Sequence, residues 1–213
     1  FPWVDDIVMD IMEGREGIMV NGIAGGGKSE VLRRMNAYCD QHGLKYVNLA
    51  PTNKAARNIG GKTIHKFFGI SRSNKMINAK KFGKLKGLDY VFIDEIGMVS
   101  STLLRFLHLC KLNNKNVRFM CFGHDWQLPP VGEKPHMDTL CVKYLCDFNK
   151  LNVTLDKRFD AHLSRISNKW YGEGKLNLKS FRDDECERHL SYTNHKRKEI
   201  NAKMMAKKRK KKK

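Results

Sequence analysis

A glycine-rich segment followed by lysine and serine is the clearest chemical feature of this 213-residue sequence. Residues 22–29 read GIAGGGKS and fit the pattern G-x-x-x-x-G-K-[ST]. Glycines let backbone N–H groups curl around phosphate oxygens, and the helix that follows adds the positive end of its dipole. In this pattern Lys28 reaches the β- and γ-phosphates and Ser29 binds Mg²⁺. The expected nucleotide-binding residues are Gly22, Gly25, Gly26, Gly27, Lys28, Ser29 and Glu30.

Two adjacent carboxylates, Asp94 and Glu95, follow the apolar run at residues 90–93. Beside a phosphate-binding loop, one carboxylate is expected to bind Mg²⁺ and another to orient the attacking water. We therefore predict Asp94 as a magnesium ligand, Glu95 as the general base, and ATP with Mg²⁺ as cofactors. Taken alone, such a pair has an equal chance of capping a helix; the glycine-rich segment favours the chemical role.

A third group of side chains, within residues 50–68, suits contact with nucleic acid. Hydroxyl and amide groups there offer phosphate donors that carry no base information, which suits binding to strands of any sequence. These donors are Thr52, Asn53 and Thr63. Three rings, those of His65, Phe67 and Phe68, are candidates for stacking on bases. Core packing is the alternative, and it is the favoured interpretation for the two phenylalanines but not for His65.

Apolar runs and helical periodicity predict the elements that position these groups. Strands are expected at residues 18–20, 46–50, 90–93 and 117–122, and helices at residues 5–13, 28–42, 54–59 and 103–112. Strands that alternate with helices predict an α/β fold with a parallel sheet flanked by crossover helices. Ligands of such sheets bind beyond the carboxyl ends of the strands, and each motif above follows a strand.

Four sequence blocks occur in an order that resembles superfamily 1 helicases of the RecD/Pif type. They are APTNKAA at 50–56, GKTIHKFF at 61–68, DEIGMV at 94–99 and GHDWQLPPV at 123–131. The family counterparts are A-P-T-x-K-A-A, T-I-H-x-F-F, D-E-I-S-M-V and G-D-x-x-Q-L-P-P-V. The resemblance implies a RecA-like P-loop NTPase fold and a DNA helicase motor driven by ATP.

The same resemblance implies roles for residues further along the chain. Gln127 would sense the γ-phosphate, and Arg158, in the block LDKRF, would contact it; a surface arginine is the alternative for Arg158. Residues 192–201, YTNHKRKEIN, resemble a strand and helix of the second motor domain. The expected catalytic residues are Lys28, Glu95, Gln127 and Arg158. The expected nucleic-acid contacts are Pro51, Thr52, Asn53, Lys54, Thr63, His65, Phe67 and Asn194.

Domain organisation follows from the same blocks. We expect a RecA-like ATP-binding motor domain at residues 1–150 with a basic, exposed excursion at 71–88. Residues 151–202 would be part of a second RecA-like domain, and 203–213 a disordered basic tail. The chain is therefore expected to be a fragment of a longer protein or a reduced natural form. Two features depart from the family: residues 1–20 lack the Gln that usually lies upstream of the glycine-rich loop, and His124 stands where the family carries Asp.

Charge gives an independent indication of the partner. Forty-one Lys and Arg oppose 22 Asp and Glu, for a net charge of +19, which favours a polyanion. A membrane surface is disfavoured because no amphipathic or lipidation signal is evident. The six cysteines show no CxxC spacing, so free thiols are favoured over a zinc site from Cys141, Cys146, Cys186 and His189.

These observations predict a helicase motor that couples ATP hydrolysis to movement on single-stranded DNA and to duplex unwinding. A nucleotide-gated nucleic-acid-binding fragment without unwinding activity, or an RNA helicase, is the alternative. Single-stranded DNA is the expected partner, with RNA as its alternative and with replication or repair proteins as further candidates. The expected location is the cytoplasm, the nucleus or a viral replication site, and the sequence leaves the oligomeric state open.

Overall fold

The computed structural model describes residues 2–14, 16–23, 25–71, 79–124, 132, 139–153 and 198. The chain divides into two compact units, Phe1–Tyr171 and Gly172–Lys213, and all described residues except Lys198 belong to the first. The predictions for Gln127, Arg158 and Asn194, for the basic tail and for nearly all of residues 151–202 therefore lie outside the described residues.

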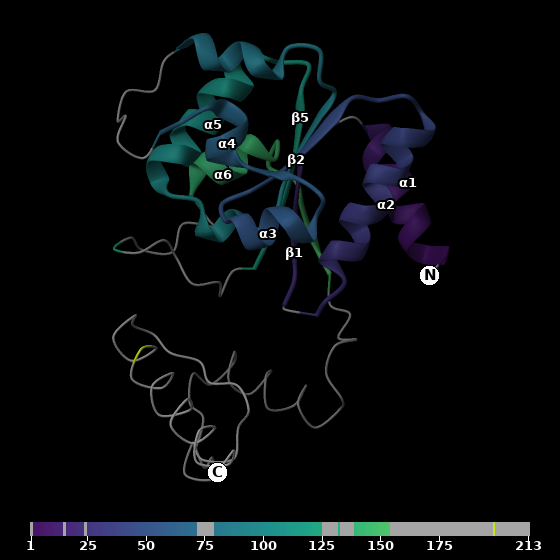
Figure 1. Ribbon diagram of the computed structural model, residues 1–213. Coiled ribbons are helices and arrows are strands. Elements are labelled where there is room, and N and C mark those ends of the chain that lie inside the picture. The colour runs from purple at the N-terminus through teal and green to yellow at the C-terminus, as the bar shows by residue number, and fades with distance from the viewer. Residues whose placement is uncertain are drawn as a thin grey trace, which may run out of the picture. The chain divides into compact units, whose positions relative to one another are not determined.

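A six-stranded sheet, in the order β3-β2-β4-β5-β1-β6, forms the centre of the first unit (Figure 1). Every neighbouring pair is parallel. The strands are β1 (Ile18–Asn21), β2 (Tyr46–Ala50), β3 (Lys62–Thr63), β4 (Tyr90–Ile93), β5 (Arg118–Gly123) and β6 (Lys150–Asn152). The predicted parallel sheet is confirmed with its four apolar strands, and the short, polar edge strands β3 and β6 were not predicted.

Helices cover both faces of the sheet. They are α1 (Pro2–Gly14), α2 (Lys28–Gln41), α3 (Asn53–Asn58), α4 (Ile64–Phe68), α5 (Ser101–Asn113) and α6 (Leu140–Leu145). Figure 1 shows α1 and α2 on one side of the sheet and α4, α5 and α6 on the other. The predictions of α1, α2, α3 and α5 are confirmed, and α4 and α6 were missed. None of the described helices is long and apolar enough to cross a membrane.

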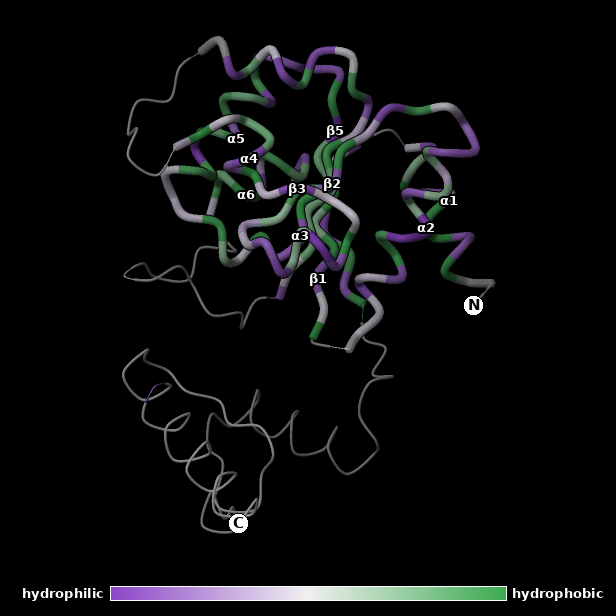
Figure 2. Tube along the Cα trace, viewed as in Figure 1, coloured by the Kyte–Doolittle hydropathy of each residue, from purple (hydrophilic) through white to green (hydrophobic). Residues whose placement is uncertain are grey.

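Alternating side chains along the strands divide the core between the two faces. In β4, Val91 and Ile93 join the cluster under α4, α5 and α6, whereas Tyr90 and Phe92 join the cluster under α1 and α2. All four of these side chains are buried. Figure 2 shows the hydrophobic residues gathered along the strands. The sheet is thus a rigid, doubly covered platform, and its strand ends can hold side chains in fixed positions.

The second part of the expected exposed excursion at residues 71–88 is largely exposed but has regular structure and one buried side chain. A 3₁₀ helix spans Ala79–Leu85, and Leu85 is fully buried in the core. Its lysines serve as caps: Lys81 Nζ donates to Gly69 O at 2.7 Å and Lys84 Nζ donates to Phe67 O at 2.8 Å. Both carbonyls lie at the C-terminus of α4, where a positive charge is favourable. The basic segment therefore anchors α4 as well as contributing charge.

Candidate nucleotide and nucleic-acid site

The glycine-rich loop connects β1 to α2 through a tight turn. Gly26 N donates to Ile23 O at 3.0 Å, and Gly25 and Gly27 have φ values of 88° and 91°. This left-handed backbone strongly favours glycine. Gly27 is the N-cap of α2 and has no side chain to cap the first turn, so the N–H groups there remain available to an anion.

Gly22 has a different reason to be glycine. A Cβ atom at Gly22 would lie 2.6 Å from the carbonyl oxygen of Val153, which follows β6. The Gly22 N–H donates to Gly123 O at 3.1 Å, at the end of β5. Packing against Val153 and the hydrogen bond to Gly123 therefore fix the start of the loop at the ends of both neighbouring strands. Gly22 keeps its predicted place in the nucleotide site because of this fixed position.

The Lys28 ammonium group lies against the loop backbone. Its Nζ donates to Ile23 O at 2.9 Å and also to Gly22 O. Burial raises the pKa of Asp94 and of Glu95, and the positive charge of Lys28 offsets part of that rise, so the loop and the carboxylates interact electrostatically. Ser29 follows in the first turn of α2 with an exposed side chain. The structure thus brings the predicted loop residues and the carboxylates together at the carboxyl ends of β1 and β4.

Too little positive charge lies near Asp94 and Glu95 to offset the effect of burial on their pKa values. Burial raises the pKa of Asp94, and a hydrogen bond from Glu95 N at 2.9 Å partly offsets that effect. Burial and repulsion from Asp94 raise the pKa of Glu95. Glu95 Oε2 is buried without a hydrogen-bond partner, and the residue has a left-handed φ of 56°. A divalent cation and a water molecule would satisfy these groups, so the donor set fits Mg²⁺ and a nucleophilic water.

Glu30 requires a correction, because its side chain does not face the loop. Its carboxylate accepts hydrogen bonds from Arg33 at 2.6 and 2.9 Å and from Arg34 at 2.8 Å. These bonds lower the pKa of Glu30 to about 2. Arg34 also pairs with Asp5 of α1. Glu30 therefore helps to hold α2 against α1, and we withdraw it from the nucleotide-binding residues.

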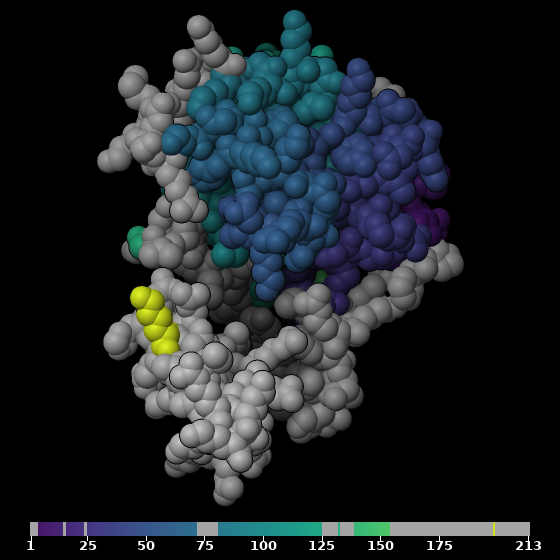
Figure 3. Space-filling view, viewed as in Figure 1, coloured from purple at the N-terminus to yellow at the C-terminus, as the bar shows by residue number. Residues whose placement is uncertain are grey.

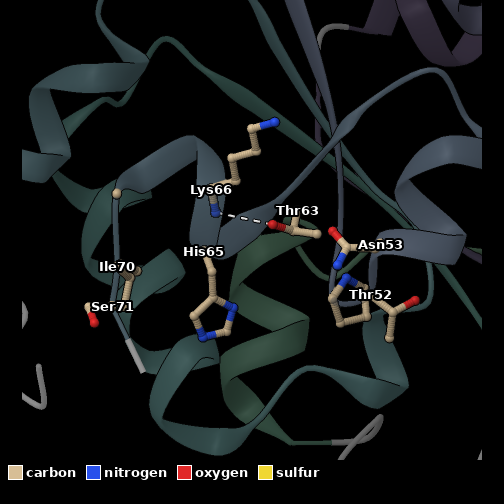
Figure 4. A pocket seen from close by; sticks show the side chains of 9 residues that line it. Thr52, Asn53, Thr63, His65, Lys66, Ile70 and Ser71 are labelled. Carbon is tan, nitrogen blue, oxygen red and sulfur yellow. Dashed lines mark hydrogen bonds between the residues drawn. The ribbon is translucent and has the colours of Figure 1, made fainter. Parts of the chain in front are cut away.

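A groove of about 710 Å³ lies at the carboxyl ends of β2 and β3, between α3 and α4 (Figure 4). It is lined by Pro51, Thr52, Asn53, Thr63, His65, Lys66, Gly69, Ile70 and Ser71. Five of the eight residues predicted to contact nucleic acid meet here, and the segment that carries them lies on the molecular surface (blue in Figure 3). Sequence reasoning missed Lys66, Gly69, Ile70 and Ser71. The lysine lies in the same block as His65, so its charge could have indicated it.

The two threonines of the groove are helix N-caps. Thr52 Oγ1 accepts from Ala55 N at 3.2 Å, and Thr63 Oγ1 accepts from Lys66 N at 3.1 Å. Each hydroxyl group keeps its proton for donation to a phosphate, because the cap uses only the oxygen lone pair. The threonines therefore both fix the starts of α3 and α4 and present donors to the groove.

Two other predicted contacts lie outside the lining of the groove. Phe67 is half-buried and meets Phe68 edge to face at a centroid distance of 4.8 Å, against the core under α4. This packing agrees with the favoured interpretation of core packing, and base stacking by the partly exposed ring stays a prediction. Lys54 lies exposed on α3, close in sequence to Asn53.

A second hollow of about 310 Å³ adjoins the groove and shares Asn53, Thr63 and Lys66 with it. Its lining also contains Arg57 and Lys62. Three cationic side chains around one hollow, beside a groove lined by hydroxyl and amide groups, favour a chain of phosphates over a neutral ligand.

Backbone hydrogen bonds connect the groove to the carboxylates. Asp94 N donates to Leu49 O at 2.9 Å, and Leu49 lies two residues before Pro51 of the groove. Close packing fixes the same region, since a Cβ atom at Gly61 would lie 2.2 Å from Asn48 O. Displacement of the Asp94 backbone would therefore act directly on the strand that leads into the groove.

Comparison with known proteins identifies the family. The AAA domain family matches residues 6–167. The DNA helicase RRM3 of Saccharomyces cerevisiae, described as ATP-dependent, is 33% identical over 146 residues, 60% of this chain and 20% of that protein. The Pif1 helicase of Bdellovibrio bacteriovorus is 29% identical over 141 residues, 58% of this chain and 31% of its own length. The chain thus spans about a fifth to a third of these relatives.

Solved structures agree on the fold. The Pif1 helicase of Bacteroides in complex with ADP-AlF3 and single-stranded DNA has a TM-score of 0.68 at 22% identity, over 95% of this chain and 56% of that one. The Pif1 helicase of Candida albicans has a TM-score of 0.65 at 24% identity, over 78% and 43%. With the glycine-rich loop, the carboxylate pair and the parallel sheet, these matches show that the chain belongs to the AAA domain family and has a RecA-like P-loop fold, similar to that of Pif1 helicases.

Proposed function

We propose that this chain is the motor part of a DNA helicase that couples ATP hydrolysis to movement on single-stranded DNA and to duplex unwinding. The observation that carries the proposal is the hydrogen bond from Asp94 N to Leu49 O, which joins the nucleotide site to the groove within one sheet. The relatives named as ATP-dependent DNA helicases support the choice of substrate.

The nucleotide chemistry follows from the geometry of the loop. The N–H groups of Gly25, Gly27, Lys28 and Ser29 and the Lys28 ammonium would hold the phosphates, with Lys28 moving from the loop carbonyls to the β- and γ-oxygens. Ser29 and Asp94 would hold Mg²⁺, which neutralises charge on the phosphates. Glu95, whose pKa is raised by burial, would accept a proton from the attacking water.

Three further roles complete the proposed motor. Gln127, in the block that follows β5, would report the presence of the γ-phosphate, and Arg158 would stabilise charge on it during transfer. Asn194 would contribute to the nucleic-acid contacts of a second motor domain. The hydrogen bond from Gly22 N to Gly123 O places the start of the Gln127 block beside the loop, which supports the first of these roles.

The groove would hold the sugar-phosphate backbone of a single strand. Thr52, Asn53, Thr63 and Lys66 supply donors for phosphates, and His65 supplies a ring for one base. These contacts ignore base identity, as a motor that moves along any sequence requires. The Bacteroides Pif1 structure with single-stranded DNA supports this choice of ligand, and RNA is the alternative strand.

A second candidate function is nucleotide-gated binding to nucleic acid without unwinding. It is favoured by the net charge of +19, which suits binding to a polyanion. Either activity belongs to the cytoplasm, the nucleus or a viral replication site, where replication or repair proteins are the natural partners.

The test is ATP hydrolysis by this chain with and without single-stranded DNA, at low and moderate salt, with Lys28→Ala as the inactive control. Stimulation by DNA that Lys28→Ala abolishes supports the motor. Binding of both ligands without turnover supports the nucleotide-gated module. Turnover in Lys28→Ala equal to that of the unmodified chain would refute the assigned site.

A further inference from the structure

A cluster of large apolar side chains lies exposed on α5 and α6, away from both parts of the site described above. The side chains belong to two stripes, one on α5 and one on α6 and the turn that follows it, and each is between 44% and 65% exposed. They are Leu109, Leu112, Leu140, Tyr144 and Phe148. None of them lines the groove or touches the glycine-rich loop. Solvent-exposed apolar side chains are common singly, but a contiguous cluster of this kind marks an interaction surface.

Ring contacts make the two stripes one surface. His108 of α5 stacks on Tyr144 of α6, with centroids 5.5 Å apart and an interplanar angle of 19°. Tyr144 in turn meets Phe148 edge to face at 4.9 Å. On α5, His108, Leu109 and Leu112 share one face at helical spacing. We call these six residues (His108, Leu109, Leu112, Leu140, Tyr144 and Phe148) the α5–α6 patch.

The backbone after α6 is held in a conformation that keeps Phe148 at the surface. Asp147 and Phe148 have left-handed φ values of 49° and 63°, which non-glycine residues rarely adopt. Asp147 is anchored on both carboxylate oxygens, by Gly17 N at 2.7 Å and by Lys111 Nζ at 2.5 Å. Lys111 also donates to the carbonyl oxygens of Tyr144 and Leu145 at 3.0 and 2.8 Å. The exposed ring is therefore presented by a fixed turn.

Positive charge borders the patch. Arg105 lies one turn before His108 and Leu109 on α5, and Lys143 lies one turn after Leu140 on α6. Both side chains are exposed, and neither has an anionic partner among the described residues. Aromatic and arginine side chains are the residues that most often dominate binding energy at protein interfaces. Arg105 and Lys143 therefore favour a partner whose apolar centre is flanked by acidic groups.

We propose that the α5–α6 patch docks an acidic amphipathic helix of a partner protein. The stripe from Arg105 to Leu112 is about 10 Å long at 1.5 Å per residue, which matches about two turns of a helix. Leucine or aromatic anchors of the partner would pack on Tyr144 and Phe148, and flanking Asp or Glu would pair with Arg105 and Lys143. A second copy of this chain is a poor occupant, because two chains of charge +19 repel each other.

The test is selection of helical peptides from a display library against the full chain. Every peptide in the library carries the same apolar stripe, and its flanking positions vary between acidic, basic and neutral residues. Clones that also bind the double variant Tyr144→Ser with Phe148→Ser are removed, so that only binders of the patch remain. Met9→Ser, an exposed apolar position on α1, is the matched control and should leave binding unchanged.

The expected clones carry Asp or Glu at the flanks and lose at least tenfold in affinity for the double variant Arg105→Glu with Lys143→Glu. Basic clones should gain affinity for that variant, which separates local pairing from attraction to the overall charge. The proposal is overturned if no clone depends on Tyr144 and Phe148, or if reversing the two charges leaves the preference for acidic flanks unchanged. It is also overturned if the chain dimerises in sedimentation through the same side chains. ATP hydrolysis of all variants should match that of the unmodified chain.

Discussion

The nucleotide site and the groove differ in how the fold holds their functional groups. At the nucleotide site the carboxylates are partly buried, repel each other and have raised pKa values, and one carboxylate oxygen lacks a partner. In the groove the polar groups lie near solvent, and the hydroxyl oxygens of its two threonines already accept helix-cap hydrogen bonds. The carboxylates of the nucleotide site therefore repel each other, and a bound cation would reduce that repulsion. The polar groups of the groove have no such repulsion and can exchange water for phosphate.

This contrast implies different sensitivities to substitution. A buried, unsatisfied carboxylate is needed for chemistry and costs stability, so its replacement should remove activity and stabilise the fold. A capping threonine contributes to both stability and binding, so its replacement should weaken both. Substitutions at the nucleotide site are thus expected to cause the largest losses of activity. Substitutions in the groove are expected to cause graded losses of DNA binding and stability.

Glu95→Gln should have the largest effect on activity. Glutamine keeps the shape of the side chain but cannot accept the proton of the attacking water, so the turnover of ATP should fall by roughly 10²–10⁴-fold. Binding of ATP should persist, because Lys28 and the loop are unchanged. Steady-state hydrolysis together with equilibrium binding of a fluorescent ATP analogue measures both. Turnover within twofold of the unmodified chain would remove Glu95 from the role of general base.

Gly61→Ala should have the largest effect on stability. The new Cβ atom would lie 2.2 Å from Asn48 O, so β2 and β3 would have to separate. A cost of about 1–3 kcal/mol is expected from overpacking. Thermal unfolding should show the loss, and single-stranded DNA should bind more weakly because the groove is displaced. Gly14→Ala, where the Cβ atom meets open space, is the control. An unchanged melting temperature for Gly61→Ala would mean that the two strands do not approach as described.

Thr63→Ala should reduce both stability and binding to single-stranded DNA. Loss of the cap on Lys66 N should cost about 0.5–2 kcal/mol. Thr63→Ser keeps a hydroxyl group and should restore most of both properties. Chemical denaturation and fluorescence anisotropy with a labelled oligonucleotide are the measurements. If Thr63→Ala binds DNA as well as the unmodified chain does, the hydroxyl group is a cap and no more.

Glu95→Gln should also change the pH dependence of stability. Because burial raises the pKa of Glu95, the folded chain holds this proton more tightly than the unfolded chain, whose ordinary value is about 4.5. The free energy of unfolding therefore falls as pH rises through that value, and the cost persists at neutral pH. The variant should melt at a higher temperature than the unmodified chain at pH 7.5 and at no higher temperature below pH 4. An equal difference at both pH values would show that charge is not the cause.

Lys66→Gln should have the smallest effect, and salt should reveal it. Loss of one phosphate contact should reduce the slope of log affinity against log salt by about 0.7 for a single strand. At low salt the loss in affinity should be several-fold and independent of base sequence. Lys45→Gln, an exposed lysine before β2, should leave the slope unchanged. An unchanged slope for Lys66→Gln would place the phosphates outside the groove.

Much of this arrangement could be predicted from the sequence, because backbone patterns dictate it. The apolar runs of β1, β2, β4 and β5 identified the sheet, and the glycine spacing identified the loop. The strand β6 was missed because Lys150 and Asn152 are polar and the strand is short, and α6 was missed with it. Such edge elements are set by pairing with β1 and packing on α5, which a local pattern does not reveal.

Side-chain roles were harder to predict than positions. Glu30 was assigned to the nucleotide because it follows Ser29, although Arg33 and Arg34, three and four residues later, are its natural partners on a helix. The sequence did not reveal that Lys81 and Lys84 donate to the carbonyls at the end of α4, because these are tertiary contacts. The raised pKa values of Asp94 and Glu95 depend on burial, which only the assembled sheet produces.

The central claim is that the two sites act as one unit through β2 and β4. The most direct test uses the Glu95→Gln chain, which should hold ATP without cleaving it, and measures the dissociation constant of single-stranded DNA with and without ATP, then that of ATP with and without DNA. We predict that both constants change by the same factor, about 5- to 150-fold, because coupling between two binding sites is reciprocal. Tight binding of each ligand with no effect on the other would contradict the account.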